Sequence, residues 1–270
     1  MKFLCNGIDW SVFAEGNGKV LVFLHGFPFD QRLYLEACRP LSDSYRVIIP
    51  DLPGFGESRF RPGAEPNCFA MGDFADGLAA LLDELGEPKA LICGLSMGGY
   101  IAMQFFRRHP DRLSGLIFCD TRSTPDLPAA AEKRRHLADS IHQTGVKSLA
   151  AQMVPSLLSP KTLASNQKVV LYLTNIISGQ DASAVAAAAR GMADRDDSTV
   201  FLKEIVVPTL FLAGEDDRIS PPSVMREMAD AVRGSEFRTI PGAGHLPPLE
   251  NPEYFALSVR TFADRVYNGG

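Results

Sequence analysis

The sequence predicts an α/β fold, with a mostly parallel sheet of eight strands and helices on both of its faces. Short and nearly continuous apolar runs recur along the 270 residues, which is typical of strands buried on both sides. Longer stretches with helical spacing separate these runs, and parallel strands need such crossover connections. The alternation is interrupted once by a purely helical segment, which predicts a helical lid inserted after the sixth strand.

Composition and charge exclude several classes of protein. Hydrophobic residues make up 46% and charged residues 22% of the chain, as in an ordinary globular protein rather than a disordered or fibrous one. The net charge of −5 gives no general attraction to phosphate backbones, so we expect no nucleic-acid partner. The first apolar run is too short for a secretory signal and no later one reaches a membrane span, so we expect a cytoplasmic protein without membrane association.

The five cysteines are odd in number and include no Cys-x-x-Cys pair. This pattern favours buried reduced thiols over a disulfide framework or a zinc site. We expect neither a metal nor a cofactor.

The strands are predicted in the following order. Apolar runs at residues 2–5 and 8–13 flank Asn6-Gly7, a strong signal for a tight hairpin turn, and predict an antiparallel edge of the sheet. Six further strands are predicted at residues 20–24, 47–49, 91–93, 116–119, 209–213 and 237–240.

The helices divide between a core and a lid. Helical spacing predicts core helices over residues 69–85, 97–108, 223–232 and 252–266, and lid helices over 129–143, 146–158, 163–177 and 182–192. We therefore expect a core domain of residues 1–121 and 205–270 and a helical cap of residues 122–204. Both ends of this insertion are expected at one edge of the sheet, over which it would fold back.

The sharpest chemical signal is Gly94-Leu95-Ser96-Met97-Gly98, which lies between a predicted strand and a predicted helix. It fits the Gly-x-Ser-x-Gly nucleophile elbow, where the turn is so tight that side chains at the two glycines would strike neighbouring backbone. The alternative is a serine that merely caps the helix. We interpret Ser96 as a nucleophile.

A serine hydroxyl needs a base, and histidine suits that role at neutral pH. His245 follows the last predicted strand, which would bring it to the same sheet edge as Ser96. His109, His136 and His142 lie at a helix end or within the lid and are not favoured.

The base needs a carboxylate to orient it. Glu215, Asp216 and Asp217 follow the predicted strand at 209–213, and Asp120 ends the preceding strand. Whichever of these acids it is, the chain order is Ser, acid, His, as in α/β-hydrolases.

Acyl transfer also needs hydrogen-bond donors for the developing oxyanion. We expect the backbone N–H groups of Met97 and Phe27 to supply them. His25, beside Phe27, is interpreted as a structural residue that bonds to loop backbone, because a second base has no task in this mechanism.

Together these motifs resemble those of the α/β-hydrolase superfamily, over nearly the whole chain except the lid. The resemblance rests on the motifs His25-Gly26-Phe27-Pro28, Asp51-Leu52-Pro53-Gly54-Phe55-Gly56-Glu57-Ser58, Gly94-Leu95-Ser96-Met97-Gly98-Gly99, Gly214-Glu215-Asp216-Asp217 and Gly242-Ala243-Gly244-His245. It implies that Asp217 is the acid, since in similar proteins the acid lies three residues after that glycine. It also implies a group that holds small carboxylesterases, enol-lactone hydrolases and cofactor-free haloperoxidases.

The expected substrate site lies between the sheet edge and the lid, with Phe27, Phe29, Tyr100 and Arg122 as candidate contacts. We expect a serine hydrolase, monomeric or homodimeric, that cleaves small carboxylic esters. An enol-lactone hydrolase with the same triad is the alternative, and it needs a cation for the substrate carboxylate, from Arg122 or the run at 133–135. A ligand-sensing hydrolase-like protein is a further alternative.

Overall fold

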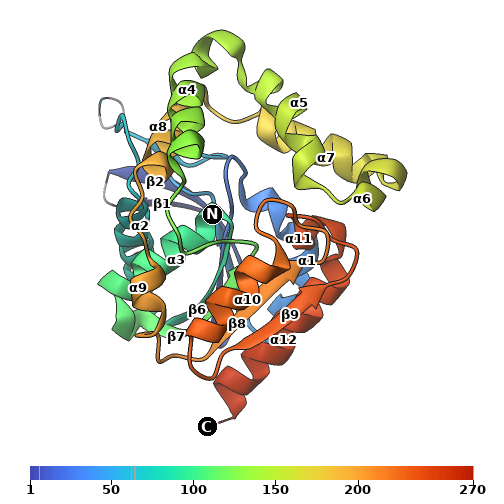
Figure 1. Ribbon diagram of the computed structural model, residues 1–270. Helices are drawn as coiled ribbons and strands as arrows, with labels where there is room; N and C mark the ends of the chain where they lie inside the picture. The colour runs from blue at the N-terminus through green and yellow to red at the C-terminus, as the bar shows by residue number, and fades with distance from the viewer. Residues whose placement is uncertain (6, 62, 64, 270) are drawn as a thin grey trace.

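A computed structural model describes residues 1–5, 7–61, 63 and 65–269. A twisted central sheet carries helices on its two faces, and a group of further helices stands above one edge of the sheet (Figure 1). This is the predicted architecture. Asn6, in the predicted hairpin turn, lies outside the described residues.

The sheet runs in the order β1-β2-β4-β3-β6-β7-β8-β9. The β1/β2 and β2/β4 pairs are antiparallel and every later pair along this order is parallel. These eight strands are the predicted ones: β1 and β3 have the predicted bounds, and the other six are one to three residues longer. Their bounds are β1 Lys2–Cys5, β2 Ile8–Glu15, β3 Val20–Leu24, β4 Arg46–Pro50, β6 Ala90–Leu95, β7 Leu113–Cys119, β8 Thr209–Gly214 and β9 Glu236–Ile240.

A ninth strand, β5 (Arg59–Phe60), pairs with β2 off the main path. The sequence did not predict it, because two residues are too short to show a periodic pattern.

The core helices cover the sheet on both faces. On one face α2 (Met71–Glu84) packs against α3 (Met97–Arg108), and on the other α12 (Pro252–Asn268) packs against the short α1 (Leu35–Cys38) (Figure 1). The other short core helices are α10 (Pro222–Ala231), α11 (Pro247–Glu250) and the 3-10 turns at Gln31–Leu33, Arg39–Asp43 and Pro110–Arg112.

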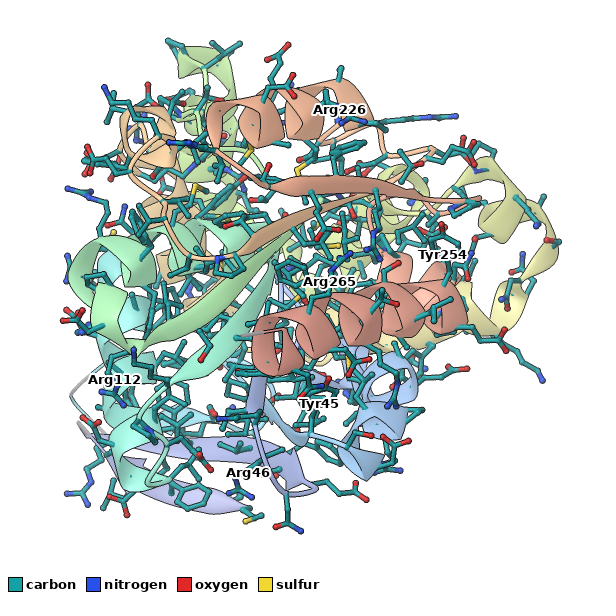
Figure 2. The ribbon with its side chains drawn as sticks, turned by 90° about the horizontal axis from the view of Figure 1, so that it is seen from below. Tyr45, Arg46, Arg112, Arg226, Tyr254 and Arg265 are labelled. Atoms are coloured by element: carbon teal, nitrogen blue, oxygen red, sulfur yellow. The ribbon has the colours of Figure 1, made fainter. Side chains whose placement is uncertain are left out.

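Two tyrosines make hydrogen bonds at the C-terminal end of α12. The Tyr267 hydroxyl donates to the carbonyl of Val20 at 2.7 Å and accepts from the N–H of Leu91 at 3.0 Å. Tyr45, seen below α12 in Figure 2, bonds to the Asp264 carboxylate. Helix α12 is thereby held across the starts of β3 and β6.

The insertion between β7 and β8 consists of helices and connecting loops, with no strand among its residues as the structure describes them. Its helices form two antiparallel groups, one of α4 with α8 and the other of α5 with α7 (Figure 1). Their bounds are α4 Pro128–Thr144, α5 Val146–Leu157, α6 Pro160–Ser165, α7 Gln167–Ser178, α8 Ala182–Ala193 and α9 Thr199–Leu202.

Two expectations about this insertion were wrong. The helix predicted at 163–177 is broken into α6 and α7 at Asn166, whose side chain accepts the N–H of Val169 and caps α7. The insertion also does not begin and end at one sheet edge. Because β7 and β8 are parallel, it leaves the carboxyl end of β7 and returns through α9 to the amino end of β8.

None of the helices in the described ranges combines the length and the hydropathy needed to cross a lipid bilayer.

Candidate active site

The site lies where four neighbouring parallel strands end. Ser96 directly follows β6, Asp120 directly follows β7, Asp217 comes three residues after β8, and His245 comes five residues after β9. The carboxyl ends of parallel strands lie at one edge of a sheet, where ligands bind in open α/β folds. Residues that are far apart in the sequence therefore meet at this edge.

Ser96 occupies a strained turn between β6 and α3. Its φ of 53° and ψ of −112° place a non-glycine residue in a rarely populated backbone region. A Cβ at Gly94 would lie 2.2 Å from the carbonyl oxygen of Gly98, and a Cβ at Gly98 would lie 2.2 Å from that of Leu24. Both positions thus require glycine, as expected for a nucleophile elbow.

His245 and Asp217 form a buried pair. Nδ1 of His245 donates to Oδ2 of Asp217 at 2.8 Å, and both side chains are almost completely buried. The second carboxylate oxygen of Asp217 accepts the N–H of Ile219 at 2.8 Å. This arrangement fixes the imidazole with Nε2 free to accept a proton.

The ionisation of Asp217 follows from its contacts. Burial alone would raise the pKa of Asp217, but the neighbouring His245 and hydrogen bonds from His245, Asp120 and the Ile219 N–H hold that pKa below its ordinary value. Asp217 is therefore an anion that can stabilise a protonated imidazole.

The other candidate acids have different surroundings. Asp216 is exposed, and Glu215 uses its carboxylate to accept the N–H of Gly242 at 2.9 Å. Asp120 contacts Asp217. Of these acids, Asp217 is the one hydrogen-bonded to the histidine in the described structure.

Two sets of hydrogen bonds connect the loop that carries His245 to the helical insertion. The backbone N–H of His245 donates to the carbonyl of Leu157, in α5, at 2.8 Å. The Glu250 carboxylate accepts the N–H of Gly244 at 2.8 Å and that of Ser159 at 2.7 Å. The sequence predicted no role for Glu250, because no local pattern shows that one of its partners, Ser159, comes from the helical insertion.

The two predicted oxyanion donors are the backbone N–H groups of Met97 and Phe27. Met97 begins α3, so its N–H has no partner within the helix. Neither this N–H nor that of Phe27 donates to a backbone acceptor within the described ranges. His25 is completely buried, donates from Nδ1 to the carbonyl of Gly26 and accepts the N–H of Leu52 at Nε2. These bonds give it the structural environment that the sequence predicted.

Ser96 is partly exposed at the surface of the site. No hydrogen bond joins its hydroxyl to His245 in the part of the chain that the structure describes, which is common in unliganded active sites, where such bonds form with the substrate.

The predicted substrate contacts differ in accessibility. Phe27 and Tyr100 are nearly buried beside the elbow. Phe29 is completely buried, and its ring packs so close to Gly26 that a Cβ there would lie 3.2 Å from it. The Arg122 guanidinium donates to the carbonyl of Ile219, in the Asp217 loop. Phe29 and Arg122 are thus engaged with protein, and a substrate would reach Phe29 only if its neighbours moved.

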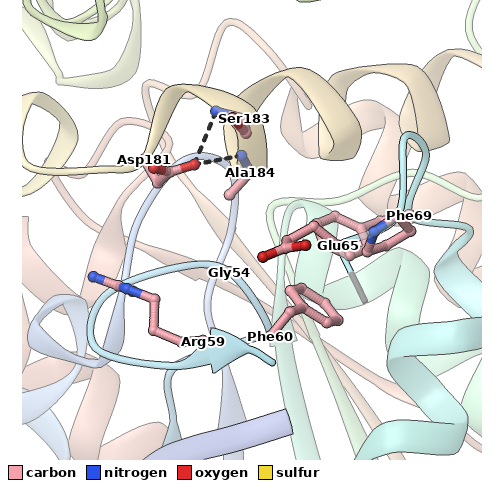
Figure 3. A pocket seen from close by; sticks show the side chains of 9 residues that line it. Gly54, Arg59, Phe60, Glu65, Phe69, Asp181, Ser183 and Ala184 are labelled. Atoms are coloured by element: carbon pink, nitrogen blue, oxygen red, sulfur yellow. Dashed lines mark hydrogen bonds between the residues drawn. The ribbon is translucent and has the colours of Figure 1, made fainter. Parts of the chain in front are cut away.

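A cavity of about 370 Å³ lies between β5 and the start of α8 (Figure 3). Of its two acids, Glu65 and Asp181, the second caps α8 by accepting the N–H groups of Ser183 and Ala184 (Figure 3). Ser96, Asp217 and His245 are not among the residues that line this cavity, which are Gly54, Arg59, Phe60, Glu65, Pro66, Phe69, Asp181, Ser183 and Ala184.

Within the described residues, one group of side chains has the spacing that a metal ion needs. Asp120, Asp217 and His245 offer ligand atoms that all lie within 4.8 Å of one another. These groups already bond to one another or to backbone, so the cluster is the candidate active site itself.

Comparison with known proteins shows which fold and family the chain shares. A thermophilic esterase from Thermogutta terrifontis is 42% identical, with a TM-score of 0.92 over 96% of this chain and 94% of that one. A curated relative, a pimeloyl-[acyl-carrier protein] methyl ester esterase from Nitrosospira multiformis, is 26% identical over 94% of this chain and 98% of its own. The enol-lactonase from Burkholderia xenovorans LB400 is 23% identical and shares the fold, with a TM-score of 0.89 over 97% of this chain and 99% of its own. The family model for the alpha/beta hydrolase fold matches residues 19–252, and the chain belongs to this family.

Proposed function

We propose that this chain is a serine esterase that cleaves small carboxylic esters with Ser96 as nucleophile, His245 as base and Asp217 as acid. The observation that carries the proposal is the buried 2.8 Å hydrogen bond from His245 to Asp217 at the sheet edge where Ser96 occupies a strained elbow. The similar protein from Thermogutta terrifontis is named an esterase, which supports the same activity.

The proposed reaction has two halves. Ser96 Oγ attacks the ester carbonyl carbon while Nε2 of His245 takes the hydroxyl proton. The resulting oxyanion accepts hydrogen bonds from the N–H groups of Phe27 and Met97. The bond to the alkoxy oxygen breaks as His245 returns the proton to it, so the alcohol leaves and the acyl group stays on Ser96.

Water completes the cycle. His245 removes a proton from a water molecule, whose oxygen attacks the acyl carbonyl, and the acid departs as Ser96 regains its proton. Asp217 remains ionised throughout and stabilises the imidazolium that forms twice in each turnover.

The proposal includes residues 122–204 as a cap on a core of residues 1–121 and 205–270. Its support is the direct contact between the insertion and the His245 loop through Leu157 and Glu250. In this proposal the packing of the cap limits the size of the acyl group.

An enol-lactone hydrolase is the second candidate, supported by a curated relative named 3-oxoadipate enol-lactonase 2, which is 22% identical. Such a substrate carries a carboxylate and needs a cation. Arg122 bonds to Ile219, Arg134 pairs with Asp126 at 2.5 Å, and Arg135 pairs with Asp194 at 2.7 Å. These pairings engage the three arginines, so Lys133 is the member of the predicted cations that has no ion pair within the described residues.

The test is hydrolysis of p-nitrophenyl esters from acetate to decanoate, together with a lactone panel. We expect turnover that peaks at short acyl chains and is abolished in Ser96→Ala. The matched control is Ser165→Ala, an exposed serine of α6 whose hydroxyl bonds only within its own helix. Fast lactone opening with weak ester turnover would replace the proposal by the second candidate. Slow turnover of every compound with a large melting shift on ligand binding would favour a ligand-sensing protein.

A further inference from the structure

Asp120 is a buried carboxyl group beside the triad. It is completely buried and directly follows β7. Its backbone has a φ of 43°, unusual for a non-glycine residue. The expected rival role, as the acid that orients the histidine, is taken by Asp217.

The contacts of Asp120 reach the loop that carries Asp217. Oδ1 of Asp120 accepts the N–H of Gly214, where that loop leaves β8, at 2.8 Å. Oδ2 lies 3.2 Å from the Cys119 thiol, which donates to it. A carboxylate oxygen of Asp120 also lies within 4.8 Å of one of Asp217.

Two buried carboxyl groups this close are more stable with one proton between them than with none, because two negative charges repel and carboxylate oxygens without a proton can only accept hydrogen bonds. The titratable groups beside this pair are the thiol of Cys119 on β7 and the imidazole of His245 after β9. The Cys93 thiol on β6 lies near Cys119. Asp217 has the imidazole as its hydrogen-bond partner. Among the described residues, the main influences on the ionisation of the two carboxyl groups include no Lys or Arg.

We infer that Asp120 is a positioning residue: a neutral carboxylic acid whose O–H donates to the Asp217 carboxylate and whose carbonyl oxygen fixes the start of the Asp217 loop. This inference rests on the proposed function, because the pair acts through His245.

Electrostatics agree with the geometry. Burial, followed by the nearby negative charge of Asp217 and the hydrogen bond between them, raises the pKa of Asp120 well above its ordinary value. The Gly214 N–H and the Cys119 thiol act in the opposite direction and are weaker. At neutral pH the proton stays on Asp120, so one negative charge faces His245 rather than two.

The acidic limb of kcat/KM against pH reports protonation of the base, His245. Its position therefore depends on the charge of Asp120. Asp120→Asn keeps a neutral group of the same shape, with an amide to donate and a carbonyl to accept, so we expect the limb to stay in place. Asp120→Ala removes the donor and leaves more charge on Asp217. A stronger anion favours the imidazolium, so we expect the limb to move to higher pH, with kcat about tenfold lower and KM unchanged.

The experiment compares these two variants with Asp216→Asn, a matched control at an exposed acid of the same loop. Asp120→Asn is decisive even where Asp120→Ala fails to fold. An ionised Asp120 would give a different result, because its replacement by Asn would remove a charge beside the imidazolium and move the limb to lower pH. That shift, or an Asp120→Ala enzyme whose kcat and acidic limb match those of Asp120→Asn, would overturn the inference.

A second measurement separates this inference from the proposed function. The midpoint of the His245 imidazole titration, followed by NMR in each variant, needs no substrate. If the wild type hydrolyses no ester, the proposed function fails, and an unchanged midpoint in Asp120→Asn with a higher midpoint in Asp120→Ala still supports the neutral Asp120. A lower midpoint in Asp120→Asn refutes it independently.

Discussion

Replacement of Gln180 by alanine is expected to loosen the lid. Gln180 follows α7 and is buried. Its Nε2 donates to Oδ2 of Asp30 at 2.8 Å, and its Oε1 accepts the N–H of Gly56 at 2.9 Å. One side chain of the lid thus bonds to two separate loops of the core.

The stability lost in Gln180→Ala is estimated from these two hydrogen bonds. Asp30 is an anion held by Arg32, and a hydrogen bond to a charged group contributes about 2 kcal/mol. The bond to the Gly56 N–H contributes about 1 kcal/mol, so Gln180→Ala should weaken the attachment of the lid by about 3 kcal/mol. If the whole chain unfolds together, the melting temperature falls by about 6 to 12 °C.

The assay combines thermal unfolding with hydrogen exchange of the lid helices. The matched control is Gln167→Ala, an exposed glutamine whose amide bonds only to Leu163 within the lid. We expect faster exchange in α5 and α7 for Gln180→Ala alone. A Gln180→Ala protein whose melting temperature and exchange match those of Gln167→Ala would refute the reasoning.

Three further predictions concern the candidate site. Asp217→Asn should lower kcat about 10³- to 10⁴-fold with little change in KM, since the imidazole loses its anionic partner, whereas Asp216→Asn should retain wild-type kcat in the same ester assay. Gly98→Ala should lower the free energy of unfolding by about 3 kcal/mol or more in urea titrations, because its Cβ meets the backbone of Leu24 at 2.2 Å; wild-type stability would contradict the strained elbow. The pKa of Asp120 is raised in the folded state. Above about pH 4 the unfolded chain loses the Asp120 proton while the folded state keeps it. Wild-type stability therefore falls as the pH rises towards the folded pKa. Asp120→Asn removes this loss, and its stability relative to wild type should grow by up to about 1.4 kcal/mol per pH unit across that window; a constant difference between pH 5 and 7 would argue against a neutral Asp120.

The sheet was predictable because its strands are buried on both faces. Continuous apolar runs such as residues 20–24 leave a clear signal, and this run is β3 without a change of bounds. The strand β5 and the short helix α9 gave no signal, since elements of two to four residues show no period. The break at Asn166 was missed because the apolar spacing of α7 continues across a polar cap.

The candidate site was predictable as far as local motifs reach. The Gly-x-Ser-x-Gly pattern carries Ser96, but the selection of Asp217 over its acidic neighbours came from the resemblance and not from the residues alone. The roles of Gln180 and Glu250 depend on partners distant in the chain, 150 residues in the contact with Asp30 and 91 in that with Ser159. The neutral state inferred for Asp120 depends on burial beside another carboxyl group, which no local pattern reports.

The most direct test of the central claim is to identify the atom that carries the acyl group. The enzyme is mixed with p-nitrophenyl butyrate, quenched in acid during turnover, and digested for mass spectrometry. The account predicts one butyryl group, on the peptide that contains Ser96, and none in the Ser96→Ala protein. Steady hydrolysis with no adduct on Ser96, or with the acyl group on another residue, would contradict it.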